Sequence, residues 1–181
     1  MNAPRDPDKP SLRDDLDQRT EGMPTAFDSM PETLAHIDAV HHNLARFRLE
    51  LQVQSSGHDL SKLYGAEKAA LDAATPRLRG ITYGSPEYQA ATANISEALK
   101  HHYANNRHHP EHHADGILGM DLIDVVEMLC DWKASSERHD DGDIRASLRI
   151  NAKRYGIGPD LLAVLENTVD RLWPTHEERE P

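Results

Sequence analysis

Histidine and carboxylate side chains are unusually dense in this sequence. The chain has 12 histidines in 181 residues, and six of them fall between His101 and His113. Imidazole is the commonest metal ligand in proteins, and carboxylates supply oxygen donors to the same ions. A histidine-rich stretch of this kind also suits a solvated polar loop or a pH-sensitive surface. Composition alone therefore supports both interpretations.

Helical periodicity indicates which histidines face inward. At about 100° per residue, His36 falls at the edge of the apolar face of a helix predicted for 31–53. His102 continues the apolar series of a helix predicted for 86–105, whereas His101 is turned about 120° away. A single inward histidine is usually a hydrogen-bonded core residue. Inward histidines on separate helices favour a shared ion instead.

His58 and Asp59 are adjacent at the start of a helix predicted for 59–74. At a helix start the first side chain can turn back while the second lies along the axis, so both can reach one ion. Because Asp is also a good N-cap, a His-Asp pair is equally an ordinary helix start.

A strip of carboxylates crosses the helix predicted for 121–137. Asp124, Glu127 and Asp131 share it, and apolar residues occupy most of the remaining circumference. The strip is either the solvated side of a surface helix or the stripe of a central one. In a central helix it needs partners, because buried carboxylates are paired or coordinate metal.

The elements that must position these side chains are helical. Apolar spacing is helical nearly everywhere, and no alternating β-branched run argues for a sheet. We predict an all-α fold, a single compact bundle of five to six helices, with the last two over 143–156 and 159–172. The predicted organisation is a flexible acidic and proline-rich arm over 1–30, a helical domain over 31–173 and a flexible tail over 174–181.

Charge and hydropathy exclude several classes of partner. The formal charge is −11, which disfavours long nucleic acid and anionic lipid. No apolar run approaches the roughly 20 residues that span a bilayer, and the first 15 residues lack an apolar signal core. The single cysteine, Cys130, fits a reducing compartment. We therefore expect a cytoplasmic protein without a membrane partner, and the sequence is compatible with a homo-oligomer.

Two resemblances follow from these motifs. The order His36, His58-Asp59, Asp124 resembles the H…HD…D signature of the HD-domain superfamily, which consists of all-helical metal-dependent phosphohydrolases. The stretches 58–62, 101–112 and 126–133 are also similar to a small bacterial and phage family of unknown function, over about 34–168.

The superfamily resemblance implies a site. One divalent ion would be held by His36, His58, Asp59 and Asp124. Asp59 would bridge to a second ion, for which the candidates are His102 and one of His108, His109 and His112, with His109 preferred. Related dinuclear proteins usually place these two histidines further apart, so either one or two ions fit. The expected catalytic residues are Asp59, Lys62 and Glu127, with Lys62 facing phosphate.

The leading hypothesis is a metal-dependent hydrolase of a phosphoester in a nucleotide or other small phosphorylated compound. Mixed nitrogen and oxygen ligands suit Mn, Fe, Co, Ni or Zn. Such an ion would activate water and polarise a phosphoryl oxygen. Arg107, Lys133 and Arg154 are candidate substrate-binding cations, or solvated surface residues, and the loop 105–118 is a candidate lid. The alternatives are a di-iron oxygenase on an HD-type scaffold and a non-catalytic, metal-stabilised binding protein.

Overall fold

The computed structural model describes residues 28–78, 80–82, 85–138 and 142–174. These residues form seven α-helices and three short 3-10 helices without any strand, which confirms the predicted all-α class. The predicted arm and tail lie outside the described residues except for 28–30 and 174. In chain order the elements are α2 (Met30–Gly57), η1 (Leu60–Leu63), α3 (Gly65–Leu78), α4 (Pro86–Ala93), α5 (Ser96–Asn105), η2 (Pro110–His112), η3 (Gly116–Gly119), α6 (Leu122–Ser136), α7 (Ile144–Tyr155) and α8 (Pro159–Leu172).

The chain divides into two compact units, the first ending at Ala45 and the second beginning at Arg46. The boundary falls within α2, which is 28 residues long and has no buried residue. We expected its apolar side chains to face the core, yet Leu34 is 58% and Phe47 48% exposed. Apolar spacing specifies a face of a helix but not what packs against it. None of the helices among the described residues is long and apolar enough to span a membrane.

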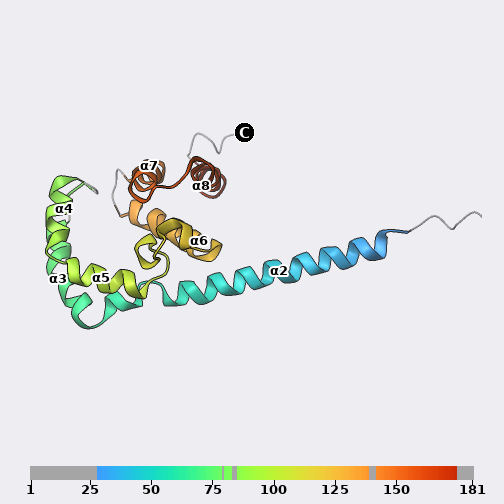
Figure 1. Cartoon of the computed structure of the whole chain (residues 1–181), viewed down its shortest axis with the longest axis horizontal. Coiled ribbons are helices and arrows are strands. Elements are labelled where there is room, and N and C mark those ends of the chain that lie inside the picture. The colour runs from blue at the N-terminus through green and yellow to red at the C-terminus, as the bar shows by residue number, and fades with distance from the viewer. Residues whose placement is uncertain (1–27, 79, 83–84, 139–141, 175–181) are drawn as a thin grey trace, which may run out of the picture. The chain divides into compact units, whose positions relative to one another are not determined.

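The hydrophobic core of the second unit is built by α6, α7 and α8 (Figure 1). Its buried side chains are Met128, Leu129, Trp132, Ile144, Leu148, Ala152, Ile157, Leu165 and Val169. The ends of these helices follow the sequence closely. Asp121 forms a capping box at the start of α6, Asp143 caps α7, and Gly156 ends α7 in the left-handed conformation at φ 66°.

Two predicted helices are interrupted. The predicted helix over 86–105 divides into α4 and α5, with Asn94 and Ile95 between them. The predicted helix over 59–74 begins as the 3-10 turn η1, and α3 starts only at Gly65, where φ is 60°. The first break gives seven α-helices where five to six were expected, and the second separates the Asp59 turn from α3.

Candidate metal centre

Asp59 has the backbone conformation that organises the site. Its φ of 57° and ψ of 13° are left-handed, and it is the only non-glycine residue with a positive φ among those described. Asp tolerates this region better than most residues, at a cost of about 1–3 kcal/mol. The turn brings consecutive side chains together, with His58 Nε2 3.5 Å from Asp59 Oδ2.

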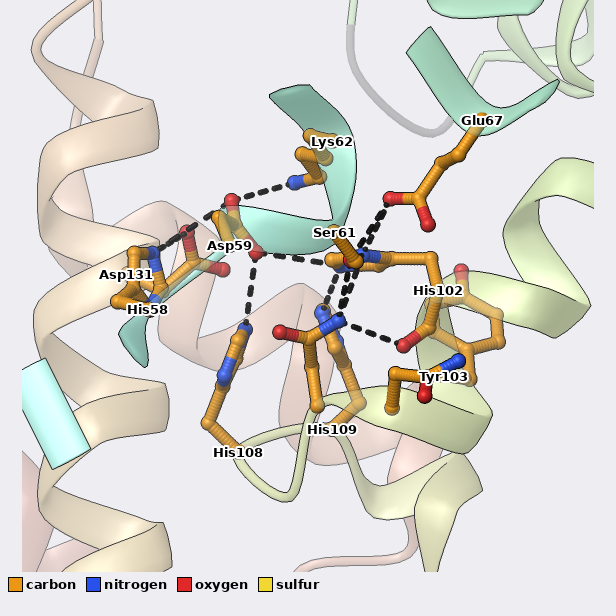
Figure 2. Close-up of polar contacts among 12 residues, drawn as sticks. His58, Asp59, Ser61, Lys62, Glu67, His102, Tyr103, His108, His109 and Asp131 are labelled. Carbon is orange, nitrogen blue, oxygen red and sulfur yellow. Dashed lines mark hydrogen bonds and ion pairs between the residues drawn. The ribbon is translucent and has the colours of Figure 1, made fainter. Parts of the chain in front are cut away.

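Four side chains from three segments, including that of Asp59, converge on one point (Figure 2). Asp59, His102, His108 and His109 each offer one donor atom, and these four atoms lie within 4.8 Å of one another. Asp59 Oδ1 is 3.3 Å from His102 Nε2 and 3.7 Å from His108 Nε2, and His102 Nε2 is 2.8 Å from His109 Nε2. We call these four residues the inner group. They could hold a metal ion.

Two atoms of the inner group are buried without a hydrogen-bond partner: Asp59 Oδ1 and His108 Nε2. Burying a polar atom without a partner is costly, and native structures rarely accept it without a compensating water or ion. Three imidazole nitrogens and one carboxylate oxygen make a four-donor set that suits a divalent transition metal. The residues present therefore fit such an ion.

Glu67 orients one histidine of the inner group from behind. Its side chain is 1% exposed, and its carboxylate accepts hydrogen bonds from His102 Nδ1 at 2.9 Å and His101 Nδ1 at 2.9 Å. Ser61 Oγ donates to the same carboxylate at 3.1 Å. A proton held on Nδ1 of His102 leaves its Nε2 lone pair directed at the inner group, which is the usual arrangement around metal-binding histidines.

Glu127 orients two further histidines, His58 and His108, in the same way. It accepts a hydrogen bond from His58 Nδ1 at 2.7 Å and lies 3.2 Å from His108 Nδ1. Burial raises the pKa of Glu127, but hydrogen bonds from His108, His58 and Gln54 outweigh it and lower that pKa to about 2. Glu127 is therefore a carboxylate throughout the physiological range and a fixed acceptor for both imidazoles.

A second set of donors shares Asp59. His58, Asp59 and Asp131 form this outer group, in which His58 Nε2 lies 3.7 Å from Asp131 Oδ1. Asp59 directs Oδ1 at the inner group and Oδ2 at the outer one. Lys62 Nζ donates to Oδ2 at 2.6 Å. Burial raises the pKa of Asp59, but the hydrogen bond and charge of Lys62 hold it below its usual range.

Two of the inner histidines, His102 and His109, are in the form that binds metal. Burial lowers the pKa of His102, and burial together with the charges of His108, His102 and Lys62 lowers the pKa of His109 to about 2. Both imidazoles are neutral at physiological pH, as ligation requires. The hydrogen bond to Glu127 raises the pKa of His58 against the opposing effect of burial.

Four of the six predicted metal ligands lie in these groups: His58, Asp59, His102 and His109. His36 is exposed, on the part of α2 that precedes Ala45, and the donor groups found among the described residues do not include it. Asp124 is fully buried and is also outside the groups. Asp131, seven residues later on the same face of α6, lies where we had placed Asp124.

Sequence reasoning left His108 as one alternative and gave Asp131 no role. His108 is 1% exposed, whereas His112 turns away and donates from Nδ1 to the carbonyl of Tyr103 at 2.9 Å. The loop leaves regular structure at Asn106, so helical periodicity could not rank the histidines that follow. For Asp131 the available signal was the carboxylate strip of α6. That strip contains several carboxylates on successive turns and does not indicate which of them lies beside the histidines.

The predicted substrate-binding cations are engaged within the protein. Arg107 pairs with Asp124 at 2.8 Å, and Arg154 pairs with Glu111 at 2.8 Å. Lys133 pairs with Glu137 and lies 5.8 Å from the ring centroid of Trp173. Lys62, the fourth cation named from the sequence, contacts Asp59, which belongs to the set of donors that could hold an ion.

The arrangement predicts an effect of Glu67→Gln. An amide keeps the size of the side chain but offers one acceptor oxygen where the carboxylate offers two, so the proton on His102 Nδ1 is less well held. We expect affinity for Zn²⁺ to fall about 10- to 100-fold. Competition with a chromophoric chelator measures this. Glu97→Gln, at an exposed residue paired with Lys100, is the matched control and should bind Zn²⁺ like the wild type. Equal affinities in the two variants would contradict an orienting role for Glu67.

Comparison with known proteins assigns a family. The model of a family of unknown function, DUF5662, matches residues 25–171. No curated protein matches the chain, and no solved structure does. The matched segment includes the inner group, the outer group and both orienting glutamates. Because the match covers most of its length, the chain belongs to the DUF5662 family.

Proposed function

We propose that this protein is a metal-dependent phosphohydrolase that acts on a phosphoester of a nucleotide or another small phosphorylated compound. The observation that carries the proposal is the convergence of Asp59 Oδ1 with the Nε2 atoms of three histidines, where two of the four atoms are buried without a partner. A His-Asp pair, later histidines and a helical aspartate also support kinship with the HD-domain superfamily, with Asp131 in the place that we had given to Asp124.

The inner group would hold one divalent ion, and the outer group would hold a second that shares Asp59. A bound divalent transition metal supplies Lewis acidity toward a phosphoryl oxygen and lowers the pKa of water. Mn, Fe, Co, Ni and Zn all accept this mixture of nitrogen and oxygen donors.

The charge around the groups favours two ions. Asp59, Asp131, Glu67 and Glu127 contribute four negative charges, and Lys62 contributes one positive charge, which gives −3 with neutral histidines. A phosphate ester is repelled by such a site. One divalent ion leaves −1 and two leave +1, so two ions turn the site into one that attracts an anionic substrate.

The side chains of the protein take distinct roles in this proposal. Lys62 is 34% exposed at its side chain, so its ammonium can contact a phosphoryl oxygen while it stays beside Asp59. Glu127, which the sequence suggested as catalytic, has a pKa of about 2 and is a weak base. Its hydrogen bonds support a positioning role, in which it fixes His58 and His108.

Metal analysis and a substrate panel test the proposal together. Protein purified without chelators should contain one or two equivalents of a transition metal by elemental analysis. It should release phosphate or nitrophenol from a panel of p-nitrophenyl phosphate, its diester and nucleoside phosphates. Dialysis against EDTA should abolish turnover, and the metal should restore it. A metal-free protein without turnover would contradict the proposal. Oxygen uptake after iron loading, without phosphoester hydrolysis, would favour the di-iron oxygenase.

A further inference from the structure

The segment that carries His108 and His109 is held by an ion pair on each side. Before it, Arg107 pairs with Asp124 of α6. After it, Glu111 accepts hydrogen bonds from Arg154 at 2.8 Å and Tyr155 Oη at 3.1 Å, both near the end of α7. His108 and His109 of the inner group therefore lie between two attachments to helices that also build the core.

Asp124 has no acceptor capacity left for a metal ion. Its Oδ1 accepts from Arg107 Nε at 3.0 Å and Gln54 Nε2 at 3.1 Å. Its Oδ2 accepts from Arg107 Nη2 at 2.8 Å and the backbone N–H of Asp121 at 3.2 Å. A carboxylate has about four acceptor positions, and donors occupy all of them here. Asp59 differs, because its Oδ1 is buried without a partner.

Arg107 is fixed through its main chain as well as its side chain. His113 Nε2 donates to the carbonyl of Arg107 at 2.9 Å. His113 in turn packs closely on Gly119, where an added Cβ would lie 2.9 Å from the Cβ of His113. With both the guanidinium and the carbonyl held, the backbone of Arg107 sets the direction in which the next two residues leave.

We propose that Asp124 and Arg107 are positioning residues that place His108 and His109 for metal binding, and that Asp124 is not itself a ligand. This inference rests on the metal site of the proposed function. A two-point fork between guanidinium and carboxylate fixes orientation as well as distance, which a lysine cannot reproduce. Because Asp124 is fully buried, the loss of Arg107 would also leave a buried carboxylate without its main charge partner.

Co²⁺ titration of the full chain tests the inference. Arg107→Gln should weaken Co²⁺ binding about 10- to 100-fold, and Arg107→Lys should weaken it less. Asp124→Asn should weaken Co²⁺ binding by about as much as Arg107→Gln does. The visible absorption band of bound Co²⁺ should keep its form in all three variants, since none of them removes a donor atom, whereas Asp59→Asn should alter it.

The chain offers a control in Arg145 of α7, whose Nε and Nη2 both donate to Oδ1 of Asp170 on α8, away from the inner group. Arg145→Gln should bind Co²⁺ like the wild type. Wild-type affinity in Arg107→Gln, or a melting temperature lowered without a change in affinity, would overturn the inference. The inference would also be overturned if the visible absorption band of Co²⁺ bound to Asp124→Asn changed in the way expected for Asp59→Asn. A wild-type chain that binds no Co²⁺ would remove the metal site and the inference together. Co²⁺ binding without phosphoester hydrolysis would overturn the proposed hydrolase alone.

Discussion

Asp59→Asn is expected to weaken binding of a transition metal by about 100- to 1,000-fold and to reduce phosphoester hydrolysis to background. Structural Zn²⁺ sites bind with about 10–16 kcal/mol, or about 2.5–4 kcal/mol for each of four ligands. Asp59 is the one residue common to the inner and outer groups, so its loss affects both. Chelator competition and the phosphoester panel measure the two effects.

Asn is the appropriate replacement because it tolerates the left-handed backbone that Asp59 adopts. Helix content by far-UV circular dichroism should therefore match the wild type. Asp72→Asn provides the control, because Asp72 is an exposed aspartate paired with Lys68 on α3. It should retain both metal binding and turnover. Hydrolysis that survives in Asp59→Asn at more than a tenth of the wild-type rate would contradict the proposed site.

The metal-free protein is expected to lose about 2.3 kcal/mol of stability from His109 alone between pH 6.5 and 4.5. The unfolded chain protonates this histidine below pH 6.5, while the folded pKa is about 2. The unfolded state thus binds more protons in this interval. The free energy of unfolding falls by about 1 kcal/mol between pH 6.5 and 5.5 and by nearly 1.4 kcal/mol between pH 5.5 and 4.5. The lowered pKa of His102 acts in the same direction.

The other groups named here whose pKa is shifted change the stability mainly outside the interval from pH 6.5 to 4.5. The pKa of His58 is raised, so its contribution is complete below pH 6.5. The pKa values of Asp59 and Glu127 are lowered, so their contributions are lost only below their unfolded values of 3.8 and 4.5. Urea unfolding in EDTA at pH 6.5, 5.5 and 4.5 should show the loss in wild type and a shallower dependence in His109→Gln. His42→Gln, at an exposed position of α2, should behave like wild type. Identical slopes in His109→Gln and wild type would refute the assignment.

Sequence patterns predicted the fold better where local chemistry decides it. The caps at Asp121 and Asp143 and the end of α7 at Gly156 follow from preferences within a few residues. The break near Ile95 and the exposed apolar side chains of α2 do not follow from such preferences, because they depend on what each helix packs against. Periodicity could predict the apolar face of a helix but could not predict which element packs against that face.

The candidate site shows the same division. The inward direction of His102 was predictable from helical spacing, and it is 2% exposed. The choice between Asp124 and Asp131 was not predictable, because both lie on one strip of α6 and the distinction is made by Arg107, which reaches Asp124 from the loop. Contacts between distant segments decide which carboxylate is paired with a cation of the protein and which remains able to bind a metal ion.

The left-handed turn at Asp59 also limits how the site can be redesigned. A β-branched or bulky side chain would clash with its own backbone there, so Gly, Asn and Asp are among the residues that accommodate φ 57° most readily. Asp is the one of these three with a charged oxygen donor. Attempts to alter the metal preference of this scaffold should therefore keep residue 59 and exchange the histidines of the loop, where the backbone imposes no such restriction.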